Sequence, residues 1–169
     1  MNTNPQEFRR VLGRFATGVT IVTSNNQGRA VGMTVNSFTS VSLKPPLVLF
    51  CAGASGLTAA AIQTSQSFAI NILSLDQHEL CRRFAGQTAD PEEDRFQQLA
   101  FRPAPQTGSP WLEGCLGWLD CRLHQIVPAG DHLILLGEVL ALERGEAADP
   151  LIFFEGGWPT VQKPAKGVG

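Results

Sequence analysis

One long segment of this chain is almost free of charge. Between Arg29 and Asp76 the only charged residue is Lys44. An exposed surface seldom stays neutral over such a length, so much of the segment must be buried. Each buried polar group that lacks a hydrogen-bond partner costs about 1–3 kcal/mol. The segment nevertheless carries many small polar side chains, for which either the fold or a bound polar ligand must supply partners: Thr34, Asn36, Ser37, Thr39, Ser40, Ser42, Ser55 and Thr58.

The length and charge of the chain limit the classes of protein to consider. We expect one domain over residues 1–161 of the 169, followed by a disordered tail at 162–169. A formal net charge of −2 offers no basic surface for nucleic acid. The four cysteines form no C-x-x-C pair and the three histidines do not cluster with them, so we expect no metal site.

The apolar residues predict a soluble protein. Residues 1–10 are polar and lack the apolar core of a signal peptide. No apolar run reaches the roughly 18 residues that a membrane span needs. We therefore expect a cytoplasmic protein that does not enter a membrane.

The pattern of the chain predicts a mostly β protein with short turns. Phe8, Val11, Leu12 and Phe15 recur at helical spacing, which predicts an amphipathic helix over 5–17. Turn residues at 25–28 predict a hairpin, and residues 116–127 alternate as in a half-exposed strand. Residues 86–109 show no clear period and read as a long loop. About seven strands are predicted, which favours an antiparallel barrel with peripheral helices. They cover 18–24, 29–35 with its continuation at 36–43, 47–52, 68–73, 116–127, 132–142 and 151–154.

Two places could bind an anion. Ser55 and Thr58 stand at the predicted start of a helix, where free N–H groups favour a phosphate. The alternative is that Ser55 is only an N-cap. Arg82 and Arg83 could reach a phosphate, or could be solvated helix residues.

His132 is the candidate for contact with a substrate. It follows a turn and opens an almost wholly apolar strand, so it could lie at the barrel rim and hydrogen-bond a carboxamide or a phosphate. The alternative is a histidine whose hydrogen bond is satisfied by Asp131 in the turn.

Several segments of the chain form a recognisable series. In order they are FATGVTIVT at 15–23, GMTVNSFTSVSL at 32–43 with PPLV at 45–48, FAINIL at 68–73, RFAG at 83–86, GDH at 130–132 and LIFF at 151–154. Together they resemble the flavin reductase-like family, the small reductase components of two-component flavin monooxygenases. The resemblance covers the chain from about Phe8 to Trp158. One departure is Trp158, where similar proteins often carry Tyr.

The resemblance implies an antiparallel, Greek-key FMN-binding split β-barrel and a homodimer with flavin near its interface. His132 would face the nicotinamide of NADH or NADPH and count as the catalytic residue. The hydride would pass to FMN or FAD, and reduced flavin would leave for a separate flavin-dependent monooxygenase. The residues implied to hold the flavin are Met33, Thr34, Val35, Asn36, Ser37, Ser40, Cys51, Ala52, Ser55, Thr58 and Phe84.

The implied mechanism depends on how the chain places the nicotinamide ring against the flavin ring. The nicotinamide C4 atom must stack about 3–3.5 Å from the flavin N5 atom, and that positioning supplies much of the acceleration. Backbone N–H groups near the ring would stabilise the negative charge that forms on reduction. No general acid or base is needed, which agrees with a site so poor in charge.

Three alternatives remain open at this stage. The protein could retain FMN and pass electrons to a protein partner. It could be a split barrel that binds flavin or haem without turnover. It could also resemble the pyridoxamine-phosphate oxidases, although those usually carry more basic residues than the single Lys44 between residues 30 and 75.

Overall fold

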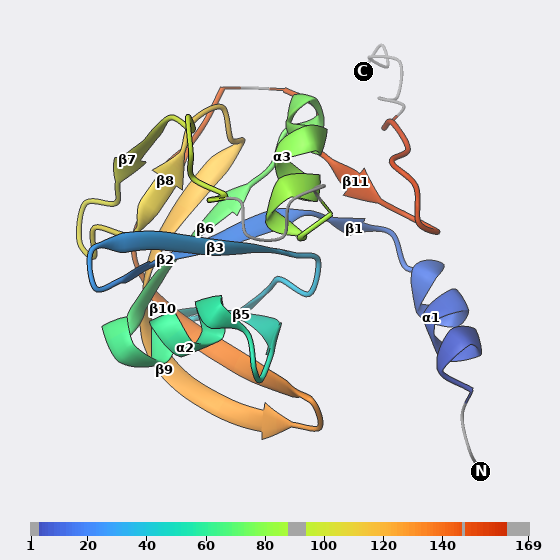
Figure 1. Cartoon of the computed structure of the whole chain (residues 1–169), viewed down its shortest axis with the longest axis horizontal. Coiled ribbons are helices and arrows are strands. Elements are labelled where there is room, and N and C mark those ends of the chain that lie inside the picture. The colour runs from blue at the N-terminus through green and yellow to red at the C-terminus, as the bar shows by residue number, and fades with distance from the viewer. Residues whose placement is uncertain (1–3, 88–93, 147, 162–169) are drawn as a thin grey trace.

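The computed structural model describes residues 4–87, 94–146 and 148–161. The chain is built around one seven-stranded antiparallel sheet (Figure 1). Its strands, in spatial order, are β3 (Arg29–Val35), β2 (Thr20–Asn26), β6 (Ser67–Ile72), β9 (Gly117–Ala129), β10 (His132–Arg144), β5 (Pro46–Gly53) and β4 (Thr39–Leu43).

The remaining elements are short and lie around this sheet. Two small two-stranded sheets pair β1 (Thr17–Gly18) with β11 (Ile152–Phe153) and β7 (Phe101–Pro103) with β8 (Pro110–Leu112). The helices are α1 (Pro5–Gly13), α2 (Leu57–Ser65), the 3-10 turn η1 (Leu75–Gln77) and α3 (His78–Phe84).

The sheet curls into an open barrel. Strands β3 and β5 come into contact, but the end strands β3 and β4 are not hydrogen-bonded to each other within the described residues. The prediction of a mostly β, antiparallel split barrel is confirmed, with the qualification that the sheet does not close.

The hairpin predicted at residues 25–28 is present. Gln27 and Gly28 both have positive φ, 52° and 90°, as a tight turn between antiparallel strands requires. The Asn25 side-chain oxygen accepts a hydrogen bond from the Gly28 N–H at 2.6 Å. Strands β2 and β3 then pair from Asn26–Arg29 to Thr20–Val35.

Alternation along the strands builds two cores, one on each face of the sheet. On β2, Val22 faces the inner core, which Ile62 of α2 completes. Its neighbour Ile21 faces the outer core, which β8 and α3 cover. The largest fully buried side chains of these cores are Trp111, Phe50, Phe68 and Phe84.

Three local predictions are wrong. The first helix ends at Gly13 and not at residue 17. Helix α2 has Gly56 as its N-cap and no side-chain cap, so Ser55 does not cap it. Within the predicted loop 86–109, residues Phe101–Pro103 form β7.

The fourth wrong prediction follows from the alternation of residues 116–127, which places Asp120 on the exposed face of a half-exposed strand. Its carboxylate is fully buried. Oδ2 accepts hydrogen bonds from the N–H groups of Gln106 at 2.7 Å and Thr107 at 3.1 Å. Oδ1 accepts one from the Thr107 hydroxyl at 2.5 Å. These contacts fix the turn before β8, and they are what makes the buried charge tolerable.

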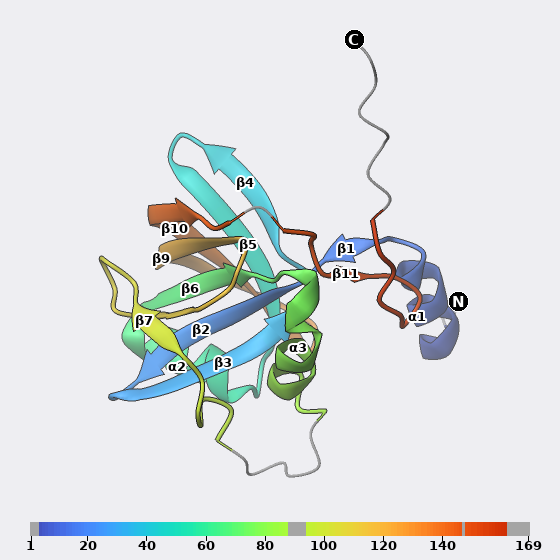
Figure 2. The ribbon, with the colours of Figure 1, turned by 90° about the horizontal axis from the view of Figure 1, so that it is seen from above.

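Helix α1 stands to one side of the barrel (Figure 2). Its link to the barrel runs through β1, which pairs with β11. The apolar face of the helix is open: Phe8 is 55%, Leu12 56% and the following Phe15 76% exposed. Across the described residues, no helix has the length and apolar character needed to cross a bilayer. The predicted tail at 162–169 lies outside the described residues.

Candidate functional site

Three segments meet at one end of the barrel. The Ser37 hydroxyl accepts a hydrogen bond from the Cys51 N–H at 2.9 Å and contacts the Cys51 carbonyl at 3.3 Å, which fixes the segment after β3 onto β5. Strand β10 begins at His132, opposite Gly53 of β5. The Ala54 N–H donates to the Asp131 carbonyl at 3.0 Å. The predicted residues Ser37, Cys51 and His132 therefore belong to one rim.

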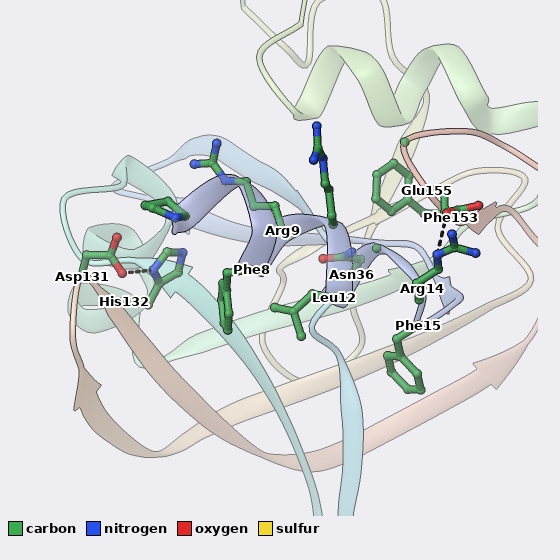
Figure 3. A pocket seen from close by; sticks show the side chains of 14 residues that line it. Phe8, Arg9, Leu12, Arg14, Phe15, Asn36, Asp131, His132, Phe153 and Glu155 are labelled. Atoms are coloured by element: carbon green, nitrogen blue, oxygen red, sulfur yellow. Dashed lines mark hydrogen bonds and ion pairs between the residues drawn. The ribbon is translucent and has the colours of Figure 1, made fainter. Parts of the chain in front are cut away.

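A cavity of about 1070 Å³ lies between this rim and α1. Asn36 and His132 line it from the barrel, and Phe8 and Leu12 line it from the helix. Figure 3 shows Phe8, Leu12 and Phe15 extending from α1 and its C-terminal end on the side of the rim. The volume is at the upper end of the range for small-molecule sites.

The His132 side chain is half exposed and contacts its neighbour. Its Nδ1 atom lies 2.7 Å from the Asp131 Oδ1 atom (Figure 3). The hydrogen bond from His132 and its charge lower the pKa of Asp131. Because Nδ1 is engaged by Asp131, Nε2 is the atom available to a ligand. The two interpretations of His132, a rim residue and a histidine satisfied by Asp131, are compatible.

A second cavity, of about 330 Å³, lies between β3, the start of α2 and residues 94–96. The predicted residues Met33 and Thr58 line it. Arg29 and Arg95 line it too, and neither makes an ion pair with another described residue. Arg95 Nη1 donates to the carbonyls of Gly32 and Phe84, each at 3.2 Å.

Sequence reasoning missed both of these arginines. Arg95 follows the stretch without periodicity, and Arg29 borders the neutral segment from outside. The length of the loop was the one available signal, since long loops in compact domains are often functional.

The fold supplies partners for some of the polar side chains of the neutral segment. The Thr34 hydroxyl donates to the Cys81 carbonyl at 2.7 Å, and Ser37 is held by Cys51 as described. Asn36 and Ser55 are exposed, and their side chains make no hydrogen bond to another described residue. These two remain free to bind a ligand.

Other predicted residues are less accessible. Val35, Ala52 and Phe84 are 6%, 1% and 1% exposed, so their side chains belong to the core and only their backbones could meet a ligand. Phe84 lies directly under Gly32, where a Cβ atom would stand 2.8 Å from Phe84 Cε1. Ser40 is exposed on β4. The assignment of all these residues to a flavin site stays a prediction.

The donors present at the rim fit a flavin. The Asn36 amide, which makes no side-chain hydrogen bond to another described residue, can bind the polar edge of a flat ring. The neighbouring cavity offers cations and the start of a helix to a phosphate. The residues present therefore suit both ends of flavin mononucleotide.

Comparison with known structures finds the same fold in flavin reductases. The NADH:FAD oxidoreductase SgcE6 of Streptomyces globisporus, solved in complex with NAD and FAD fragments, has a TM-score of 0.84 and 34% identity, over 100% of this chain and 99% of that one. The flavin reductase PheA2 gives a TM-score of 0.86 and 38% identity, over 95% of this chain and 100% of that one.

Sequence comparison gives the family. A flavin reductase of Pseudomonas putida is 42% identical, over 92% of this chain and 89% of its own length. The reductase subunit HsaB of a flavin-dependent monooxygenase of Rhodococcus jostii is 39% identical, over 94% of this chain and 79% of its own length. The model of the flavin reductase like domain matches residues 12–162. The chain belongs to the flavin reductase-like family.

Proposed function

We propose that this protein is an NAD(P)H:flavin oxidoreductase that reduces FMN or FAD and releases it to a partner monooxygenase. The observation that carries the proposal is that Asn36 and His132 line one large cavity at the barrel rim. The similarity to flavin reductases, to an NADH-dependent FAD reductase and to an NADH-dependent FMN reductase supports it.

The residues of the rim would hold the reactants in place. The backbone N–H groups of residues 34–37 and the Asn36 amide would bind the polar edge of the flavin ring. When bound, the flavin supplies the hydride acceptor, its N5 atom. His132 would donate a hydrogen bond from Nε2 to the nicotinamide carboxamide, with its ring orientation set by Asp131. Fixing the two rings in stacking contact is the main contribution of the chain.

The second cavity would hold the flavin phosphate. Arg29 and Arg95 line it together with Asp94 and make no ion pair with a described residue, and Thr58 stands in the first turn of α2. Ser55 precedes that turn and is exposed. A single phosphate fits the FMN assignment, and the open cavity leaves room for FAD.

The association state and the partner belong to the same proposal. The exposed apolar residues Phe8, Val11 and Leu12 of α1 suit a contact with a second copy, which supports a homodimer. The relatives that are reductase subunits of monooxygenases support an oxygenase as the recipient of reduced flavin. A cytoplasmic location stays a prediction.

Anaerobic mixing tests the proposal. Purified protein with one equivalent of FMN is mixed with excess NADH, and the flavin absorbance is followed in a stopped-flow instrument. We expect bleaching far faster than with FMN and NADH alone. Bleaching at the uncatalysed rate would contradict the proposal. Rapid bleaching by a protein that keeps its flavin through gel filtration would instead support an electron carrier.

A further inference from the structure

Trp158 stands where the sequence departs from similar proteins, which often carry Tyr. It follows the turn at residues 154–157 and is not among the described residues that line the large cavity. Its partly buried indole packs on two other rings. The ring centroids lie 5.0 Å apart for His78, the first residue of α3, and 5.3 Å apart for Phe153 of β11. Trp158 therefore fixes the segment after β11 against α3.

The turn before Trp158 is held from both sides. Ahead of β11, the Leu151 N–H donates to the Leu73 carbonyl at 3.1 Å, which joins the segment to the end of β6. Beyond the turn, the contact between Trp158 and His78 joins the same segment to α3. Strand β11 and residues 154–157 lie between these two attachments, so their position depends on both.

The turn itself is tight and borders the large cavity. Its central residues Glu155 and Gly156 have positive φ, 49° and 78°, and both line the cavity. Phe154 and Gly157 exchange backbone hydrogen bonds of 3.1 and 2.8 Å. A two-residue turn of this kind has little conformational freedom. We therefore expect it to move as one unit with Trp158.

This turn holds helix α1. The Glu155 N–H donates to the Gly13 carbonyl at 3.1 Å, and Glu155 Oε1 lies 2.8 Å from Arg14 Nε (Figure 3). Strand β1, which follows the helix, pairs with β11 at Thr17 and Phe153. Figure 2 shows β11 and the segment after it beside β1 and α1. No residue of α1 is buried, so the position of the helix depends on these contacts.

We propose that Trp158 is a positioning residue that sets how far α1 stands from the barrel rim, and thereby the width of the large cavity. The inference rests on the proposed reductase function, because that function places the reactants in this cavity. Trp158 acts through the turn at residues 154–157 and contacts no reactant itself. Its loss loosens the wall that α1 provides, while His132 and the rest of the rim still orient whatever is bound.

Two measurements on Trp158→Leu test the inference. In hydrogen exchange followed by mass spectrometry, the amides of residues 5–18 should exchange about tenfold faster, because two aromatic contacts are lost. The amides of the central strand β10 should exchange as in the wild type. In steady-state kinetics the KM for NADH should rise about fivefold, with kcat and the flavin dissociation constant unchanged.

Three further variants act as controls. Trp158→Tyr keeps a ring that can pack on Phe153 and His78, and it should restore wild-type exchange and KM. His78→Ala removes the same contact from the side of α3 and leaves the indole on Phe153, so both effects should appear with a smaller size. It keeps the test available if Trp158→Leu does not fold. Phe101→Leu removes a 42% exposed ring of β7 that packs on Phe96, away from the turn, and should change neither quantity.

The outcomes separate this inference from the proposed function. Wild-type protein that does not oxidise NADH with added flavin contradicts the proposed function itself. Unchanged exchange at residues 5–18 in Trp158→Leu and His78→Ala overturns the inference, because α1 is then held by other contacts, such as a second copy. Faster exchange at these residues with an unchanged KM overturns it too, since the position of α1 would not affect binding. Faster exchange throughout the chain would mean that Trp158 only supports the fold, and it also counts against a positioning role.

Discussion

Asp131 Oδ1 lies 2.7 Å from His132 Nδ1 at the mouth of the large cavity, and the Asp131 side chain is 95% exposed. A carboxylate in water needs no partner to satisfy it, so the contact is not required for the stability of the turn. Its consequence is an oriented imidazole whose Nε2 atom is free. Under the proposed function, we expect this pair to contact the nicotinamide.

Replacing His132 tests this role. We expect His132→Ala to slow flavin reduction by NADH about tenfold, because one positioned hydrogen bond to the carboxamide is lost. The flavin dissociation constant should hardly change. Stopped-flow reduction measures the rate and fluorescence titration the affinity. His124→Ala, which removes an exposed histidine of β9, is the control. An unchanged reduction rate in His132→Ala would remove His132 from the site.

A negative charge introduced at the start of α2 tests the phosphate site. Ser55 is exposed and precedes the N-cap Gly56. In Ser55→Glu a carboxylate would face the bound phosphate, and FMN affinity should fall about tenfold. Ser55→Gln has the same shape without the charge and should bind FMN nearly as the wild type does. Riboflavin, which has no phosphate, should bind both variants alike. Equal FMN affinity in the two variants would contradict a phosphate at this helix end.

The buried Asp120 carboxylate predicts a stability effect away from the site. Asp120→Ala leaves the N–H groups of Gln106 and Thr107 without their acceptor. We expect the free energy of unfolding to fall by about 2–4 kcal/mol in urea titrations, because the bonds to a charged group are lost. Asp94→Ala is the control, since Asp94 is exposed and accepts one local hydrogen bond from the Phe96 N–H. Equal stability of the two variants would show that the turn is held by other contacts.

The cysteines predict an order of alkylation. Burial raises the pKa of Cys115 to about 12 and also raises the pKa of Cys81 and Cys121, so few thiolates form at neutral pH. Cys51 on β5 is only partly buried. Iodoacetamide followed by mass spectrometry should modify Cys51 first, and FMN should slow that reaction if Cys51 borders the site. Modification of Cys115 should accelerate as the pH rises toward about 12. Earlier modification of Cys115 in folded protein would contradict this order.

Much of the barrel could be predicted because its turn residues and the alternation along its strands are local sequence patterns. The turn at residues 25–28 and the period-two pattern of the flanking strands determine the β2–β3 hairpin without any distant contact. The apolar strand β10 was recognised as central, and it does pair with both β9 and β5. Asp120 was misplaced because its partners, Gln106 and Thr107, lie in a loop that carries no periodicity of its own.

In the candidate site, too, local sequence motifs identified some residues, while others come together only in the folded chain. Asn36 and His132 were identified from short motifs, and the structure places both on one cavity. Arg29 and Arg95 were missed because they are adjacent only after β3 has folded beside residues 94–96. Ser55 was assigned as a cap because its residue type is favoured there, but Gly56 takes the position one residue later. A single-residue shift of this kind is decided by the backbone path and not by residue preference.

The most direct measurement is NADH consumption by the purified protein at increasing concentrations of free FMN, each in excess over the enzyme. The reductase account predicts turnover that rises with FMN and saturates, which shows that flavin is taken up and released in each cycle. Absence of NADH consumption at every FMN concentration would contradict the account.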